Sequence, residues 1–233
     1  MEIYPGIELI DLGLYLTKHK ILVLSDFHIG YEEGLSKKGV LVPRMQYKDV
    51  IARLDMIFSK VKPKMIVING DLKHEFGVIS QQEWKDVMRL IDYFERRGEL
   101  VLIKGNHDTI LGPIADKKKI KVVDELFVDD VLITHGHKVP KRLAEVIIIG
   151  HEHPAVFIRS DVRSEKYKCY LKGKYKRKVL IVQPSFNLLT DGTDVGSEDL
   201  LSPFLDQNLS NFEVFVVDKE IYDFGKLKNL SLQ

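Results

Sequence analysis

The sequence of 233 residues has little cysteine, no long apolar run and almost no net charge. Cys169 is the one cysteine, which excludes an internal disulfide and is typical of a reducing compartment. No apolar run approaches the roughly 20 residues of a membrane span. The amino terminus lacks the basic and apolar regions of a secretory signal. We therefore expect a cytoplasmic protein with no membrane partner.

The charge balance argues against one class of nucleic-acid binder. Lysine and arginine number 35 against 34 for aspartate and glutamate, so the chain lacks the strong positive field of a dedicated nucleic-acid coat protein. Hydrophobic residues at 45% and charged residues at 30% indicate a folded globule. At this length we expect one domain spanning residues 1–233.

Five apolar runs are each followed by a polar loop. The first, Ile21-Leu22-Val23-Leu24, leads into Asp26 and His28. The later runs lead into Asn69-Gly70-Asp71, Gly105-Asn106-His107-Asp108, His135-Gly136-His137 and Gly150-His151-Glu152-His153. Continuous aliphatic runs predict strands that are buried on both faces, and open α/β sheets bind ligands at the carboxyl ends of such strands.

The histidines gather in these loops. Of the eight histidines, only His19 lies outside the loops or their immediate continuation, where His74 follows Asp71 by three residues. The alternative to a binding site is a group of loop histidines that cap helices and turns. We favour one metal site, because several motifs agree in context.

The donor set predicts more than one cation. It mixes oxygen and nitrogen ligands: Asp26, His28, Asp71, Asn106, His135, His151 and His153. A single zinc ion needs about three or four ligands, so we expect two divalent cations. Manganese fits such donors, with iron, zinc, nickel or magnesium as alternatives. Two cations about 3.5–4 Å apart generate hydroxide from bound water and clamp a phosphoryl group, which predicts phosphoester hydrolysis by metal-bound hydroxide.

In order and spacing, the five loops resemble the signature of the calcineurin-like metallophosphoesterase superfamily. The resemblance covers residues 21–154. It implies an α/β fold, a four-layer α/β/β/α sandwich of two mixed β-sheets flanked by helices, with the metals at the strand ends. Residues 155–233 are expected to supply strands and loops of the second sheet.

The resemblance also implies a role for each ligand. It assigns Asp26, His28 and His153 to the first metal. It assigns Asn106, His135 and His151 to the second metal, and it makes Asp71 the bridge between them. His107 would donate a proton to the leaving oxygen or stabilise charge in the transition state.

His74 directs the resemblance toward one branch of the superfamily. The Ser/Thr phosphatase branch has an aspartate at this position. The segment from Gly70 to His74 resembles instead the SbcD-type DNA-repair nucleases, in which a histidine here assists catalysis. This favours phosphodiester substrates. The alternative for His74 is a hydrogen bond that supports a metal ligand.

Three further features have competing interpretations. Asp108 either orients His107 or caps the following turn, and we favour the turn. His137 can face the site together with His135, so we expect it to touch the substrate or support a ligand. The basic run over residues 166–178 either follows a nucleic-acid backbone or is a solvated hairpin, which is commoner for charge runs.

Apolar periodicity predicts helices over residues 47–60 and 81–97, with Gly98 as the cap glycine of the second. A short helix is expected at 140–145. Residues 31–43 are expected to be irregular, and residues 190–203 to form a long loop. A hairpin is expected to turn at Lys172-Gly173-Lys174.

We expect a metal-dependent phosphodiesterase that acts on DNA, RNA or nucleotide diesters. In outline the chain is similar to the small SbcD-related phosphoesterases, including those associated with DNA ligases. One alternative is a phosphomonoesterase or cyclic-nucleotide phosphodiesterase. A metal-binding scaffold without activity is the other, and the intact set of ligands argues against it.

Overall fold

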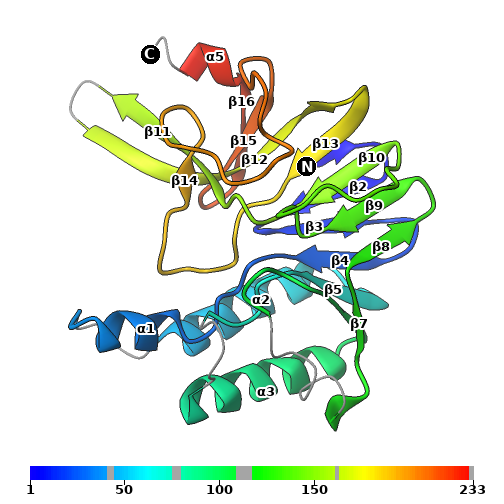
Figure 1. Ribbon diagram of the computed structural model, residues 1–233, viewed down its shortest axis with the longest axis vertical. Helices are drawn as coiled ribbons and strands as arrows, with labels where there is room; N and C mark the ends of the chain where they lie inside the picture. Colours follow the sequence, from blue (N-terminus) through cyan, green and yellow to red (C-terminus); the bar gives the residue numbers. More distant parts are fainter. Residues whose placement is uncertain (41–44, 75–79, 109–116, 161–162, 231–233) are drawn as a thin grey trace.

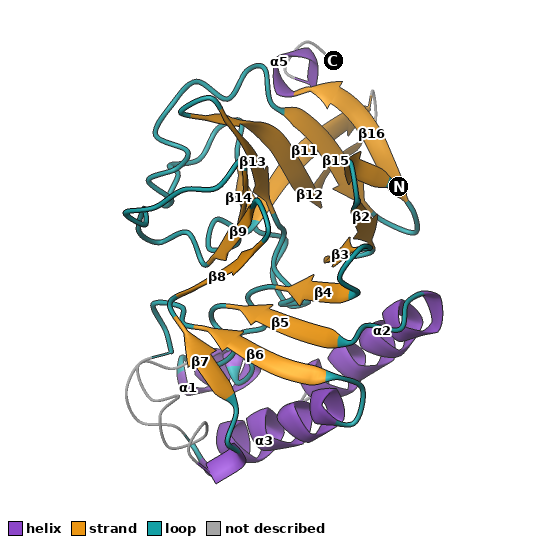
Figure 2. Cartoon of the chain, turned by 90° about the vertical axis from the view of Figure 1, so that its right-hand side faces the viewer, coloured by secondary structure: helices purple, strands orange, loops and turns teal. Residues whose placement is uncertain are grey.

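The computed structural model describes residues 1–40, 45–74, 80–108, 117–160 and 163–230. Two β-sheets pack face to face, and helices cover the outer face of the first sheet (Figures 1 and 2). None of the helices in these ranges has the length and apolar content needed to cross a bilayer. The expected α/β class, with two mixed sheets and flanking helices, is confirmed.

In the described part of the chain, the first sheet has seven strands, which neighbour one another in sequence order. They are β1 (Glu2–Tyr4), β2 (Ile7–Ile10), β3 (Gly13–Leu16), β4 (Ile21–Leu24), β5 (Met65–Asn69), β6 (Glu99–Ile103) and β7 (Lys121–Val123). Strands β1 to β4 pair antiparallel, and β4 to β7 pair parallel. All four residues of β4 are buried, as expected for a parallel strand covered on both faces.

Among the described residues, three helices accompany this sheet: α1 (Tyr31–Lys37), α2 (Gln46–Lys60) and α3 (Gln81–Glu95). The two long helices confirm the periodicity prediction, because α2 buries Val50, Leu54 and Ile57 in the same core as the sheet. Helix α3 begins at Ser80, whose hydroxyl accepts a hydrogen bond of 3.0 Å from the Glu83 N–H.

Over the same described ranges, the second sheet has nine strands with both parallel and antiparallel pairs. They are β8 (Glu125–Val128), β9 (Val131–Thr134), β10 (Val146–Ile149), β11 (Pro154–Ser160), β12 (Arg163–Tyr175), β13 (Lys178–Val182), β14 (Thr193–Asp194), β15 (Glu213–Val217) and β16 (Ile221–Lys226). Strand β10 lies parallel to both β9 and β13.

The outer face of the second sheet is covered mainly by the loop between β14 and β15. Phe204, Leu205 and Leu209 of this loop belong to the same buried cluster as Ile147 and Leu180 of the sheet. The short helix α5 (Leu227–Leu230) adds Leu227 to that cluster. Within the described ranges, the fourth layer is therefore built chiefly from loop residues.

One predicted helix, one segment predicted to be irregular and one predicted helix end are wrong. Residues 140–145 form no helix, and the following Val146 N–H donates to the Asp130 carbonyl at 3.0 Å, which starts β10. Helix α1 occupies part of the 31–43 segment, of which 41–43 lie outside the described residues. It buries only Gly34, so it lacks the apolar periodicity of a core-facing helix. Gly98 is not in the left-handed region, and α3 ends at Glu95.

The predicted turn at Lys172-Gly173-Lys174 is also wrong, because these residues continue β12 and pair with β13. The hairpin turns instead at Lys176 and Arg177, which both have positive φ, 46° and 66°. Gly173 serves packing, since a Cβ there would lie 2.5 Å from the Phe212 ring. The prediction interpreted Gly173 as a turn residue, whereas the glycine is needed in the strand because the Phe212 ring packs against its backbone.

Candidate metal centre

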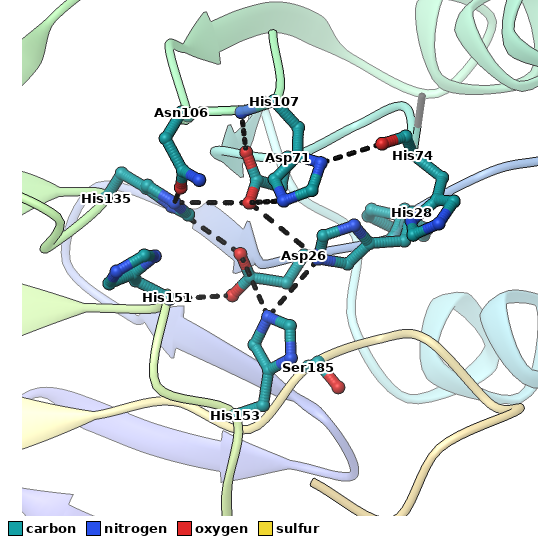
Figure 3. A network of polar contacts seen from close by, with 12 residues as sticks. Asp26, His28, Asp71, His74, Asn106, His107, His135, His151, His153 and Ser185 are labelled. Atoms are coloured by element: carbon teal, nitrogen blue, oxygen red, sulfur yellow. Dashed lines mark hydrogen bonds and ion pairs between the residues drawn. The ribbon is translucent and has the colours of Figure 1, made fainter. Parts of the chain in front are cut away.

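The ends of five strands bring the predicted ligands into one cluster (Figure 3). Asp26 and His28 follow β4, Asp71 follows β5, Asn106 and His107 follow β6, His135 follows β9, and His151 and His153 follow β10. Potential ligand atoms lie within 4.8 Å of one another in three groups, namely Asp26, His28 and His153, then Asp71, His135 and His151, then His28, His74 and His107.

Asp26 has one oxygen held by the protein and one that faces ring nitrogens. Its Oδ2 accepts hydrogen bonds from the Ser25 hydroxyl at 2.5 Å and from the His151 N–H at 3.0 Å. Its Oδ1 is buried and has no hydrogen-bond partner in the described part of the chain. That oxygen lies 3.5 Å from Nδ1 of His135 and 3.5 Å from Nε2 of His153. A buried carboxylate oxygen without a hydrogen bond fits a cation ligand.

Asp71 lies between the first two groups. Its Oδ1 accepts a hydrogen bond of 2.9 Å from the His107 N–H. Its Oδ2 is 3.7 Å from Nε2 of His28 and 3.4 Å from Nε2 of His135. One carboxylate oxygen therefore stands within reach of ligands from both groups.

Two pairs of ligand atoms lie side by side. Nε2 of His28 is 3.3 Å from Nε2 of His153, and Nε2 of His135 is 3.1 Å from Oδ1 of Asn106. The Nδ1–H of His135 donates to the Asn69 carbonyl at 3.3 Å, which orients the ring so that Nε2 faces Asn106 and Asp71. The donor chemistry of the cluster thus suits borderline divalent cations.

The electrostatics of the cluster favour the neutral, metal-binding form of two ligand histidines and place a charge on a third in the absence of a cation. Burial and the neighbouring His153 lower the pKa of His28 to about 3, and burial and His135 lower the pKa of His151 to about 4. Neutral imidazole is the form that binds metals. Burial opposes a charge on His135, but the carboxylates of Asp26 and Asp71 raise its pKa to about 9. The two buried carboxylates therefore draw positive charge to this point.

Five of the proposed ligands have a left-handed backbone. The φ angles are 54° at Asp26, 47° at His28, 41° at Asp71, 65° at His151 and 52° at His153. Such conformations are uncommon outside glycine and cost on the order of 1–3 kcal/mol each. Strain of this kind concentrates at functional sites, where the surrounding structure enforces it.

Three glycines make room for the ligands of other loops. An added Cβ at Gly70 would lie 2.0 Å from Nδ1 of His135, and one at Gly105 would lie 2.0 Å from Oδ1 of Asp71. At Gly150 it would lie 1.9 Å from the Ser25 hydroxyl. These glycines carry no side chain that would signal a role, although one precedes a ligand in each of three motifs. Ser25 was missed as well, because its side chain acts on Asp26 from the strand end.

His107 and His74 lie beside the ligands. The Nδ1–H of His107 donates to the His74 carbonyl at 2.7 Å, and the two rings stack with centroids 5.8 Å apart. Nε2 of His107 is 4.0 Å from Oδ2 of Asp71. Asp108 accepts a hydrogen bond of 3.0 Å from the Gly105 N–H and so closes its own loop.

His137 lies on the other side of the cluster. Its ring centroid is 5.2 Å from that of His135 and 6.1 Å from that of His151. Glu152 points away from the ligands, and its buried carboxylate accepts hydrogen bonds from the Leu201 and Ser202 N–H groups at 2.8 and 2.9 Å. It ties the loop after β14 to the loop that carries His151.

A cavity of about 380 Å³ opens beside the cluster. Four site histidines line it, together with Tyr31 of α1 and Lys166 of β12. The segment after β13 forms a further wall, with Asn187, Thr190, Asp191, Gly192 and Thr193. The four histidines are His28, His74, His107 and His153.

The basic run over residues 166–178 is divided among separate partners. Lys166 bonds Glu198 at 2.6 Å, Lys168 bonds the Ser185 hydroxyl at 2.8 Å, and Lys172 bonds Glu213 at 2.8 Å. Lys178 pairs with Glu145. Three of these four lysines therefore pair with a carboxylate, and the fourth donates to a hydroxyl.

A family model described as calcineurin-like phosphoesterase matches residues 19–155. Among solved structures, nuclease MPE of Pseudomonas putida aligns with a TM-score of 0.68 and 20% identity over 93% of each chain, which shows a shared fold. The phosphoesterase YfcE of E. coli aligns with a TM-score of 0.40 and 15% identity over 85% of this chain and 87% of its own. No curated protein matches. Because the family model spans more than half of the 233 residues, the chain belongs to the calcineurin-like phosphoesterase family.

Proposed function

We propose that this protein is a phosphodiesterase that uses two divalent cations to hydrolyse nucleic acid or nucleotide diesters. The observation that carries the proposal is the place of Asp71. Its Oδ2 lies 3.7 Å from His28 and 3.4 Å from His135, which belong to different ligand groups. A carboxylate that two neighbouring cations can share is well suited to hold them as close together as two-metal hydrolysis needs.

We assign the ligands as two sets that share Asp71. Asp26, His28 and His153 hold one cation, and Asn106, His135 and His151 hold the other. The donors are oxygen and nitrogen without thiolate, which favours manganese, with iron or zinc as alternatives. When bound, such cations act as Lewis acids and lower the pKa of coordinated water.

His107 is placed to act on the leaving group. Its Nδ1–H is held by the His74 carbonyl, so its Nε2 faces the cluster and the ring lines the cavity. From there it can donate a proton to the leaving oxygen or stabilise the charge that develops on it. His74 lines the same cavity and positions His107 through its main chain.

The cavity favours diesters over monoesters. A monoester dianion carries more charge than a diester and needs more cationic donors. Lys166 is the one lysine in the described lining, and its ammonium bonds Glu198 and the Gly192 carbonyl. The fold shared with nuclease MPE of Pseudomonas putida supports the same assignment, because that protein is described as a nuclease.

The test compares kcat/KM of the manganese-loaded protein on bis(p-nitrophenyl) phosphate, p-nitrophenyl phosphate, cyclic nucleotides and DNA. We expect the diester to exceed the monoester. A preference for p-nitrophenyl phosphate would make the protein a phosphomonoesterase instead. Inertness of the metal-loaded protein on every substrate would leave only a metal-binding scaffold.

A further inference from the structure

The cavity extends along one side of the metal centre. Its described lining includes His28 and His153 from one ligand set, together with His74 and His107. It does not include any ligand that belongs only to the other set. Because we place His107 at the leaving oxygen, the leaving part of the substrate would project into this cavity.

The lining beyond the histidines suits a polar, hydrogen-bonding group, because its lysine, Lys166, is already paired with Glu198. Thr190 offers a hydroxyl, and Asp191 lines the cavity with an exposed carboxylate. That carboxylate would repel a further phosphate but can accept hydrogen bonds from a base N–H or a sugar hydroxyl. The volume of about 380 Å³ falls in the range of small-molecule pockets.

Tyr31 gives the cavity an aromatic wall. It is the first residue of α1 and is half-buried. Its ring meets the His74 ring edge-on, with centroids 4.7 Å apart and an angle of 66° between the planes. The contact holds the tyrosine ring next to the histidines that flank the leaving group. Aromatic rings at such positions stack on nucleobases of any sequence.

We propose that this cavity is a nucleoside subsite, in which Tyr31 stacks on the base of the leaving nucleoside and Asp191 binds a polar edge of the base or sugar. The inference rests on the proposed phosphodiesterase function and adds the substrate class. It selects diesters whose leaving part is a nucleoside over polyphosphates, because Lys166 is paired with Glu198 and the exposed carboxylate of Asp191 opposes additional phosphates.

The test uses thymidylyl-thymidine and its two analogues that each lack one base. With the wild-type protein, removal of the base of the leaving nucleoside is expected to lower kcat/KM about tenfold, as for the loss of one base stack, and removal of the other base is expected to have little effect. Tyr31→Ala is expected to lower kcat/KM for thymidylyl-thymidine to the value for that analogue, and to leave kcat/KM for the analogue unchanged. Tyr31→Phe should keep the preference. Tyr222→Ala, at an exposed tyrosine of β16, is the matched control.

A second measurement needs no turnover. Calorimetry on manganese-loaded His107→Ala protein compares thymidine monophosphates with the corresponding deoxyribose phosphates, and the nucleotides are expected to bind about tenfold more tightly. The added Tyr31→Ala change should abolish this difference.

Two results would overturn the inference. One is equal cleavage of all three dinucleotide substrates by the wild-type protein, together with equal binding of nucleotides and deoxyribose phosphates. The other is an equal loss on all three substrates in Tyr31→Ala, which would mean that the ring only supports His74. Under either result the wild-type protein still hydrolyses bis(p-nitrophenyl) phosphate, whereas failure of the proposed function means that it does not.

Discussion

The main-chain N–H of His107 donates a hydrogen bond of 2.9 Å to Oδ1 of Asp71, which ties the loop after β6 to the loop after β5. The other oxygen of Asp71 faces His28 and His135. One carboxylate therefore both fixes the loop that carries His107 and joins the two ligand sets. Because the donor is a main-chain group, the side chains of these two residues can be tested separately.

Asp71→Asn should lower metal occupancy at both positions. The amide keeps an oxygen that can accept the His107 N–H but removes the negative charge that both cations would share. Metal content per chain after dialysis against manganese measures the effect, and Asp223→Asn on the exposed strand β16 is the control. Loss of only one of two metals would contradict the bridging role.

His107→Ala should keep the metals and lower kcat by a factor of about 10²–10⁴, the usual contribution of a general acid. The variant retains the main-chain N–H that holds Asp71, so the metal centre is expected to stay intact. Metal analysis and single-turnover kinetics on one preparation check both statements. A metal-depleted variant would place His107 among the ligands instead.

Gly105→Ala should disrupt the centre although glycine is no ligand. The new Cβ would lie 2.0 Å from Oδ1 of Asp71 and 2.3 Å from its main-chain nitrogen, so the two loops must separate. We expect lower manganese occupancy and loss of diesterase activity.

Gly196→Ala is the control for this substitution. Its Cβ would approach nothing nearer than 3.5 Å, and its φ is not positive. Metal content and thermal unfolding should therefore match those of the wild-type protein. Equal behaviour of the two alanine variants would show that the loop after β6 can shift without cost to the site.

The strands that end in the site could be predicted because their sequences have no competing interpretation. Four consecutive aliphatic residues in Ile21–Leu24 and in Val146–Ile149 cannot face water on either side. The polar residues after them could then be expected at one edge. Helices α2 and α3 could also be predicted from the sequence, because their buried residues recur at helical spacing.

The remainder depends on contacts between distant segments. Glycine between two lysines is typical of a turn, yet Gly173 lies in strand β12, where the absence of a side chain leaves room for the Phe212 ring. The Asn69 carbonyl orients His135 through the main chain, for which the side-chain pattern gives no signal. The wall of the cavity after β13 is set by β14, which pairs Thr193 and Asp194 with β11. Roles of this kind follow from the folded chain and not from any one motif.

Lys168 should make stability depend on pH above neutrality. Its amine donates to the buried Ser185 hydroxyl at 2.8 Å, and burial, with a smaller contribution from Arg53, lowers its pKa from 10.5 to about 7. Between these two values the unfolded chain binds a proton that the folded chain does not. The free energy of unfolding should therefore rise with pH across this window, by up to about 1.4 kcal/mol per unit. Below pH 7 the lysine is charged in both states, and this contribution is absent.

Lys168→Met should flatten that rise, because methionine keeps the apolar stem and has no proton to lose. Urea unfolding between pH 7.5 and 9.5 measures the slope, and Lys174→Met, at an exposed lysine of the same strand, is the control. Other titrating groups contribute equally to all three proteins, so the difference in slope isolates Lys168. Parallel lines for the wild-type protein and Lys168→Met would mean that the amine stays charged in the folded state, held by Asp191 and Asp26, the two carboxylates that raise its pKa.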